Sequence, residues 1–257
     1  MYPVLFSIGG LEITSFGVLV ALGALAGVSL FRRELLRSGL PEGAVDGAVV
    51  GVIAGLAGAK LLWVFEHLGE EPFTSLLFSR GGLSWFGGLI GGVGAALAYF
   101  VIKGYPLLPT IAAATPALAA GHAIGRLGCF MVGDDYGRPT DLPWGVAFPK
   151  GLPPTLDRVH PTQLYEAAFL AVLTVLLIRW RRSGVADHAV LGRYLLLAGA
   201  ARFLIEFLRI NTRVLGPLTV AHIAALLMMA AGVAVMSFRP RPAAGHAAAR
   251  REARSRR

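Results

Sequence analysis

The chain has 257 residues, of which 55% are apolar and only 15% are charged, and its mean hydropathy is +0.65. These values exclude an ordinary soluble globular domain, which carries more charge and shorter apolar runs. The single cysteine, Cys129, excludes an internal disulfide and a cysteine-cluster metal site.

Apolar runs recur along the chain, each close to the length of about 20 residues that crosses the hydrocarbon core of a bilayer. The pattern predicts an all-α polytopic membrane protein with about seven transmembrane helices. The expected spans are 14–31, 46–65, 83–101, 107–124, 163–178, 190–208 and 217–237. Residues 87–92 read Gly-Gly-Leu-Ile-Gly-Gly, and such small residues allow two helices to pack closely.

The net charge of +9 is distributed by topology rather than in a nucleic-acid-binding patch, so no nucleic acid partner is expected. Basic residues follow the first, third, fifth and seventh spans, whereas the segment after the second span is acidic. By the positive-inside rule, the amino terminus lies outside and the carboxyl terminus in the cytoplasm. The basic residues are Arg32, Arg33 and Arg37, then Lys103, then Arg179, Arg181 and Arg182, and seven arginines after Phe238.

Both ends of the chain have distinctive compositions. The amino terminus lacks the basic region of a cleaved signal peptide, so we expect the first span to be retained. Residues 238–257 are rich in Arg, Ala and Pro and have no apolar face. We expect this basic tail to be disordered in the cytoplasm and to lie on anionic lipid headgroups.

One dense polar stretch, from Gly125 to Glu166, separates the fourth and fifth spans. It contains Arg, Asp, Tyr, Trp and His together with turn-forming Gly and Pro. The alternation of sides places it at the outer face of the membrane. Irregular segments between transmembrane helices are where binding residues are found most often, so we expect a binding site here.

Several ionisable residues fall at membrane depth, where an unpaired charge is unfavourable by several kcal/mol. Arg202 and Glu206 are four residues apart and share a helix face, so a structural ion pair is one interpretation. Arg126 follows the fourth span, and two arginines from different helices would form a clamp for a phosphate group. Lys60 has two equally consistent interpretations: its side chain extends so that the amine reaches the membrane–water interface, or the amine has a role in function.

Other polar residues of this region are candidates for proton transfer or orientation. Asp134 and Asp135 could orient an arginine or accept a proton, or could simply form a turn. His122 lies one turn before Arg126 and is either a proton acceptor or a buried structural histidine. His160 precedes Pro161 at an expected helix start and is more consistent with a structural role. No metal-ligand spacing is present, so no metal or other cofactor is expected.

These motifs resemble the bacterial phosphatidylglycerol–prolipoprotein diacylglyceryl transferase family over nearly the whole chain to about Phe238. The polar stretch contains Gly-Arg-x-Gly-x-Phe from Gly125, Pro-Trp-Gly from Pro143 and His-Pro-x-Gln-Leu-Tyr-Glu from His160. Two further matching segments are Ile-Thr-Ser-Phe-Gly at 13–17 and Gly-Gly-Leu-Ser-Trp-Phe-Gly-Gly at 81–88. A third is 202–209, which contains Arg202, Glu206 and Arg209.

The resemblance implies an inner-membrane enzyme that transfers the diacylglyceryl group of phosphatidylglycerol to the lipobox cysteine of a prolipoprotein and releases glycerol phosphate. It makes 1–237 a transmembrane catalytic domain that includes a periplasmic loop, 125–162. It assigns the essential arginines to Arg126 and Arg202, the loop acid to Asp134, the helix acid to Glu206 and the signature glycine to Gly137. We add His122 as a catalytic candidate. The sequence indicates no oligomeric state.

Three positions differ from the family pattern, in which Asn, Tyr and His are usual where this chain has Cys129, Phe16 and Phe86. We assign these three, with His160 and Tyr165, to substrate binding. Because the family histidine is the proposed base for the thiol, its absence leaves a second hypothesis open: a catalytically impaired relative that binds or transports phospholipid. Cys129 as a covalent nucleophile is a weaker alternative, since a lone cysteine is more often an apolar filler.

Overall fold

The computed structural model describes residues 4–9, 11–79 and 82–237. Seven of its helices are long and apolar enough to cross a membrane, as the sequence predicts. They are α1 (Ser15–Arg37), α2 (Ala44–Glu66), α4 (Trp85–Ile102), α5 (Leu107–Val132), α6 (Thr162–Arg182), α7 (Asp187–Glu206) and α8 (Val220–Ser237). The predicted basic tail, 238–257, lies outside the described residues.

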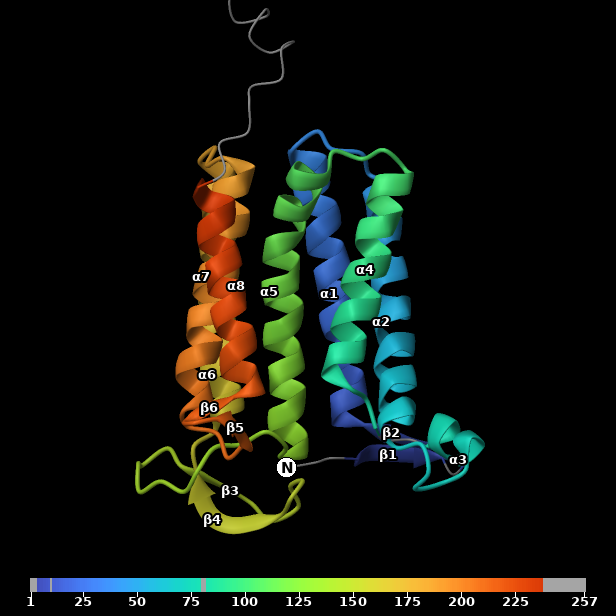
Figure 1. Cartoon of the computed structure of the whole chain (residues 1–257), viewed down its shortest axis with the longest axis vertical. Helices are drawn as coiled ribbons and strands as arrows, with labels where there is room; N and C mark the ends of the chain where they lie inside the picture. The colour runs from blue at the N-terminus through green and yellow to red at the C-terminus, as the bar shows by residue number, and fades with distance from the viewer. Residues whose placement is uncertain (1–3, 10, 80–81, 238–257) are drawn as a thin grey trace, which may run out of the picture.

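The helices are arranged around α5, which packs against α1 on one side and α6 on the other (Figure 1). The remaining long helices form two pairs, α2 with α4 and α7 with α8. The α2–α4 contact depends on glycine: a Cβ added at Gly58 would lie 2.5 Å from the carbonyl oxygen of Gly87. The glycines of the third span therefore serve close helix packing.

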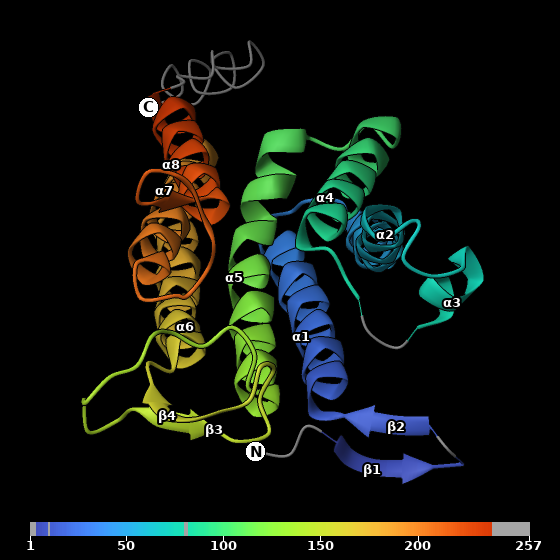
Figure 2. The ribbon, with the colours of Figure 1, turned by 60° about the horizontal axis from the view of Figure 1, so that its bottom comes forward.

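Three two-stranded antiparallel sheets and the short helix α3 (Phe73–Phe78) lie at one end of the helices, here called the strand end (Figures 1 and 2). The strands are β1 (Val4–Ile8), β2 (Leu11–Thr14), β3 (Val146–Phe148), β4 (Thr155–Val159), β5 (Arg213–Leu215) and β6 (Leu218–Thr219). The polar stretch contributes β3 and β4, so it is a folded hairpin unit rather than a plain loop.

The stacked rings of Tyr136 and Phe148, 5.3 Å apart, hold the β3–β4 unit together. Phe130 of α5 packs edge-on against Phe148 with ring centroids 5.7 Å apart. Both Phe148 and Val159 of the strands are buried. This small apolar core fixes the hairpin against the end of α5.

The fourth span extends farther than the sequence predicts. We placed its end at 124 and the loop at 125–162, but α5 continues to Val132, so Arg126 and Cys129 lie on a helix. Gly133 ends the helix with φ 78°, a left-handed conformation that glycine adopts without steric penalty. Polar residues alone do not end a helix, and the sequence-based boundary at the first arginine was therefore wrong.

A buried ion pair joins the helices at the opposite end from the strands. Arg181 of α6 lies 2.9 Å from Glu34 of α1 and 3.4 Å from Asp187 of α7. Only 5% of the Arg181 side chain and 2% of the Glu34 side chain are exposed. This network is remote from the strand end, and its arginine joins three helices.

Candidate functional site: an arginine–carboxylate cluster

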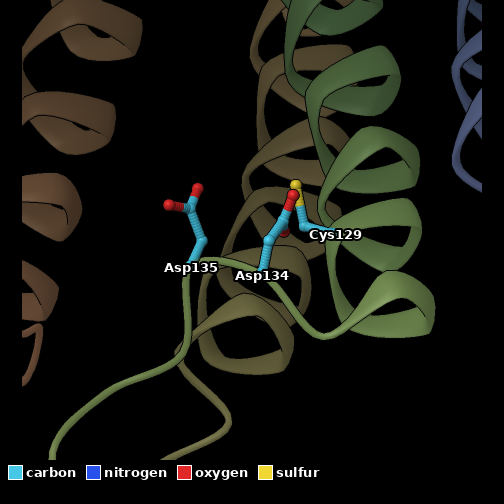
Figure 3. Close-up of side chains that lie close together, drawn as sticks. All are labelled: Cys129, Asp134 and Asp135. Carbon is cyan, nitrogen blue, oxygen red and sulfur yellow. The ribbon is translucent and has the colours of Figure 1, made fainter. Parts of the chain in front are cut away.

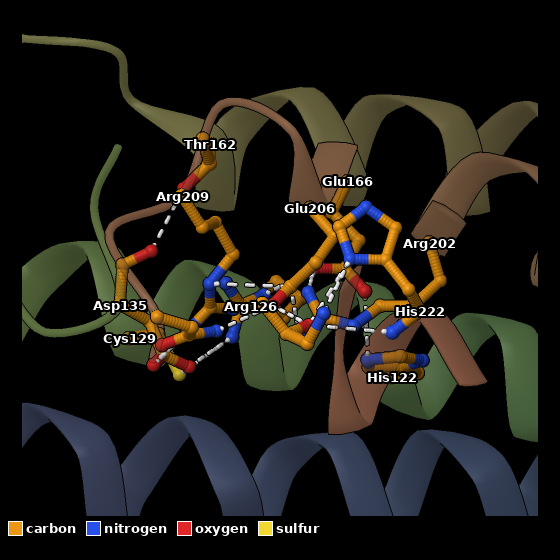
Figure 4. Close-up of polar contacts among 12 residues, drawn as sticks. His122, Arg126, Cys129, Asp135, Thr162, Glu166, Arg202, Glu206, Arg209 and His222 are labelled. Carbon is orange, nitrogen blue, oxygen red and sulfur yellow. Dashed lines mark hydrogen bonds and ion pairs between the residues drawn. The ribbon is translucent and has the colours of Figure 1, made fainter. Parts of the chain in front are cut away.

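Three arginines and three carboxylates converge where α5, α6 and α7 meet near the strand end (Figure 4). Arg126 comes from α5, Arg202 from α7 and Arg209 from the turn after α7. The acids are Asp135, Glu166 and Glu206, and these six residues form what we call the arginine–carboxylate cluster. With all six ionised, three positive charges face three negative charges.

Arg126 is the central member of the cluster. Its Nη1 lies 2.8 Å from Oδ2 of Asp135, and its Nε lies 3.0 Å from Oε2 of Glu166. Nη1 also approaches the sulfur of Cys129 at 3.5 Å. Nη2 is buried and has no hydrogen-bond partner within the described chain. A buried donor is normally satisfied, so Arg126 presents one donor that is available to a ligand.

Arg202 is the most accessible of the three arginines, with 26% of its side chain exposed against 8% for Arg126 and 6% for Arg209. Its Nη2 lies 2.8 Å from Oε2 of Glu206, four residues along the same helix. Its Nη1 lies 3.8 Å from Oε2 of Glu166, so Glu166 stands between Arg126 and Arg202. The two arginines expected from the sequence to form a clamp are thus brought together.

Asp135 is held in place by an unusual backbone conformation. Its φ is 60°, in the left-handed region that Asp tolerates better than most residues. Its carboxylate binds Arg126 on one oxygen and Arg209 on the other. Burial favours a higher pKa for Asp135, but the guanidinium groups of Arg209 and Arg126 outweigh it and hold that pKa below the ordinary value.

Asp134, the acid assigned from the family pattern, has a different environment. Its carboxylate lies beside the sulfur of Cys129 (Figure 3), and its Oδ1 is buried without a hydrogen-bond partner among the described residues. Burial, followed by the charge of Asp135, raises the pKa of Asp134. The sequence could not distinguish these neighbouring acids; the fold directs Asp135 to the arginines.

One ligand atom each from Cys129, Asp134 and Asp135 lies within 4.8 Å of the others, a spacing that a metal ion could bridge (Figure 3). Both oxygens of Asp135 are already engaged by arginines. Two guanidinium charges at this position oppose the binding of a cation. The arrangement therefore suits an anion better than a metal ion.

His122 lies one turn before Arg126, with its Nε2 3.5 Å from Oε1 of Glu166. The interpretation of His122 as a buried histidine was wrong, because 44% of its side chain is exposed. It lies beside Arg202 (Figure 4). This position suits proton transfer to or from a ligand.

The turn after α5 is tied to α6 by backbone contacts. Gly137 donates its N–H to the carbonyl of His160 at 2.9 Å. A Cβ at Gly137 would lie 2.6 Å from the carbonyl oxygen of Leu208 and 2.9 Å from a carbon of His160 or Thr162. Only glycine fits there, and its neighbour across the contact, Leu208, directly precedes Arg209.

His160 and Tyr165 lie outside the arginine–carboxylate cluster. Tyr165 accepts a hydrogen bond from Nε1 of Trp144 at 2.8 Å and lies 3.3 Å from Nδ1 of His160. Burial, together with Arg138, lowers the pKa of His160. These three side chains link the hairpin unit to the start of α6.

The two phenylalanines that differ from the family pattern occupy unequal positions. Phe16 of α1 packs on α5 at Gly128, where an added Cβ would lie 3.2 Å from its ring. Phe86 is 43% exposed in the first turn of α4, with Trp85 edge-on at 5.3 Å. Lys60 is also apart from the cluster and donates to the carbonyl oxygen of Ser79 at 2.9 Å.

Sequence reasoning assigned no site role to four contributors, although Glu166 falls at membrane depth one turn into the fifth expected span. Glu166 and Arg209 were visible as charged residues, but nothing in the sequence indicated that they would meet Arg126 and Arg202 through shared carboxylates. Thr219 and Asn211 each contact Oε1 of Glu206 at 2.7 Å. Both residues follow Glu206 in the chain after the end of α7, so no helical or strand periodicity relates them to Glu206 or predicts the contact.

Comparison with known proteins agrees with the motifs. The family model described as prolipoprotein diacylglyceryl transferase matches residues 3–238. The phosphatidylglycerol–prolipoprotein diacylglyceryl transferase of Clostridium tetani is 32% identical over 83% of this chain and 87% of its own length. The Clostridioides difficile protein of the same name is 31% identical over 91% and 93%, and that of Geobacter sulfurreducens 34% over 80% and 82%. This chain therefore belongs to the prolipoprotein diacylglyceryl transferase family.

Proposed function

We propose that this protein transfers the diacylglyceryl group of phosphatidylglycerol to the cysteine thiol of prolipoproteins and releases glycerol phosphate. It is a multi-pass protein of the bacterial inner membrane. The observation that carries the proposal is the buried Nη2 of Arg126, which has no hydrogen-bond partner among the described residues, beside the partly exposed guanidinium of Arg202. Two such groups at the end of transmembrane helices form a site for a lipid phosphate.

Arg126 and Arg202 bind the phosphate diester and stabilise the charge that grows on the departing glycerol phosphate. In the reaction, the bond between the glyceryl carbon and its phosphate oxygen breaks, and the oxygen keeps the electron pair. The leaving phosphate thereby gains negative charge. Preorganised cationic donors at the position of growing charge are often a large contribution to catalysis.

The incoming thiol loses its proton as the carbon–sulfur bond forms, and we assign His122 as the acceptor. The sulfur must approach the glyceryl carbon from the side opposite the phosphate, which is toward the acyl chains. His122 is four residues before Arg126 on α5, so it lies about 6 Å farther from the strand end. Glu166, at 3.5 Å, orients the imidazole.

Asp134 lies on the other side of Arg126, toward the departing glycerol phosphate, where its raised pKa suits proton donation. Glu206 holds Arg202, and Gly137 allows the turn after α5 to approach α6. We assign Cys129 and Phe16 to the wall of the lipid site.

We assign His160, Tyr165 and Phe86, which lie outside the arginine–carboxylate cluster, to binding of the lipobox segment. The domain assignment is one transmembrane catalytic domain over 1–237. We place the strand end at the outer face, with the amino terminus outside, because the basic helix ends lie opposite it. The periplasmic loop then begins at Gly133 rather than at 125.

The decisive experiment supplies purified protein in detergent with phosphatidylglycerol labelled in its acyl chains and a lipobox peptide. The wild type is expected to transfer the label to the peptide thiol, and Arg202→Ala to abolish transfer. Complementation of a strain depleted of its own transferase tests the same reaction in cells. Lipid binding without transfer or rescue would instead identify a phospholipid-binding relative and overturn the proposal.

A further inference from the structure

Glu206 is the most enclosed acid of the arginine–carboxylate cluster, and its two oxygens have different partners. None of its side chain is exposed. Oε1 accepts hydrogen bonds at 2.7 Å from the hydroxyl of Thr219 and from Nδ2 of Asn211. Oε2 lies 2.8 Å from Nη2 of Arg202 and 3.8 Å from Nε of Arg209. The neutral donors thus fix one oxygen, which leaves the other directed at the arginines.

Thr219 is itself held by His222, three residues along the chain at the start of α8. The backbone N–H of His222 donates to Oγ1 of Thr219 at 3.3 Å, and the backbone N–H of Thr219 donates to Nδ1 of His222 at 3.1 Å. This reciprocal pair has the arrangement of a helix capping box, in which the fourth residue is ordinarily Glu or Gln. Here a histidine nitrogen takes the acceptor role.

The direction of the Thr219 hydroxyl follows from this pair. Its oxygen accepts the backbone N–H of His222, and its single proton has two acceptors within reach: Oε1 of Glu206 at 2.7 Å and Nδ1 of His222 at 3.1 Å. Because Nδ1 already accepts the backbone N–H of Thr219, the shorter contact to Glu206 takes the hydroxyl proton. The backbone N–H of Thr219 uses Nδ1 of His222 as its acceptor, and Nε2 is buried without a hydrogen-bond partner among the described residues. His222 is 1% exposed, and the rings of Phe203 and Phe207 lie 5.0 and 4.5 Å away. The ring therefore has little freedom to turn.

We propose that Thr219 and His222 are positioning residues that hold the Arg202 guanidinium in its phosphate-binding place through Glu206. The chain of contacts runs from the His222 ring to the Thr219 backbone and hydroxyl, then to Glu206 and Arg202. Because Arg202 is the most accessible arginine of the cluster, it depends most on this support. The inference rests on the proposed function where it is tested by the rate of lipid transfer, but not where it is tested by retention of phosphatidylglycerol.

Two matched pairs of variants test the inference in the purified full-length protein. Thr219→Val keeps the shape but removes the hydroxyl, whereas Thr219→Ser keeps the hydroxyl. His222→Leu removes the acceptor nitrogen, whereas His222→Gln restores the capping-box acceptor. The readouts are KM for phosphatidylglycerol and kcat in label transfer, retention of phosphatidylglycerol by the protein, and the thermal midpoint.

Loss of a hydrogen bond to a buried charged group corresponds to about a ten- to hundredfold change in an equilibrium. We expect Thr219→Val and His222→Leu to lose that factor in kcat/KM, chiefly through KM, and to retain less phosphatidylglycerol. Thr219→Ser and His222→Gln should stay within about threefold of the wild type. A wild type that retains lipid but does not transfer it would refute the proposed function, while the retention data would still decide the positioning role.

Wild-type kcat/KM and lipid retention in Thr219→Val would overturn the inference. Equal loss in both members of either pair would also overturn it, because packing rather than hydrogen bonding would then explain the defect. A fall in thermal midpoint with unchanged lipid retention would assign the pair to the stability of α8 alone.

Discussion

Replacement of Arg126 by Lys separates the charge of this residue from its geometry. Arg126 uses Nη1 for Asp135 at 2.8 Å and directs Nε at Glu166 at 3.0 Å. Its Nη2 has no hydrogen-bond partner in the part of the chain that the structure describes. A lysine keeps the charge but is a point donor and cannot cover these separated positions. One lost charge-assisted hydrogen bond to phosphate is about 1.5–3 kcal/mol, or roughly ten- to a hundredfold in kcat/KM. Label transfer from phosphatidylglycerol measures the loss.

The matched control is Arg181→Lys at the opposite end of the helices. Arg181 is equally buried and also pairs with two carboxylates, Glu34 and Asp187. We expect both variants to lower the thermal midpoint in detergent, but only Arg126→Lys to lose activity in the protein that remains folded. Activity of Arg126→Lys within twofold of the wild type, or an equal loss of activity in Arg181→Lys, would refute the role of the separated Arg126 guanidinium donors.

Four further variants test separate parts of the site. His122→Ala should lower kcat by about a hundredfold or more, as expected for loss of a general base, with KM for phosphatidylglycerol unchanged; its residual rate should rise with pH toward the thiol pKa of about 8.5. A pH-independent residual rate would exclude the assignment. Gly137→Ala should destabilise the protein by about 1–3 kcal/mol through overpacking, whereas Gly94→Ala, where an added Cβ has no neighbour within 4 Å, should not; equal thermal midpoints would contradict this. Asp135→Asn should lower the thermal midpoint at pH 7. Because the folded-state pKa of Asp135 is lowered, its stabilisation is present above its unfolded pKa of about 3.9 and is lost as pH falls through the folded value, so the two proteins should converge in acid. Cys129→Ser should transfer lipid within about twofold of the wild-type rate, and loss of transfer would revive the covalent alternative.

Much of the transmembrane architecture follows from the sequence, because a bilayer restricts a spanning helix to long apolar segments. The start of α6 after Pro161 was predicted within one residue, since proline cannot continue a preceding helix. The end of α5 was not, because Arg126 and Cys129 continue the helix until Gly133 provides the left-handed residue that ends it. The strands escaped prediction because they are short.

Two members of the site, Arg126 and Arg202, could be chosen from the sequence because a charge at membrane depth requires a partner or a ligand. The carboxylates that pair with these two arginines could not be identified from the sequence. Glu166 lies 40 residues from Arg126 in the chain and meets it only because α5 and α6 pack side by side. Asp135 rather than Asp134 pairs with the arginines, and it does so with its backbone in the left-handed conformation, which the sequence does not indicate.

The sequence by itself determined the membrane class, the spans, the family and the pair of arginines, since each depends on composition or on an ordered motif. Only the tertiary structure decided how those charges are balanced: Glu166 lies between Arg126 and Arg202, Asp135 lies between Arg126 and Arg209, and Glu206 is fixed by Thr219 and Asn211. The physical reason is that hydrogen bonds and ion pairs act over about 3 Å. Distances of that order between residues far apart in the chain are set by helix packing and turn geometry.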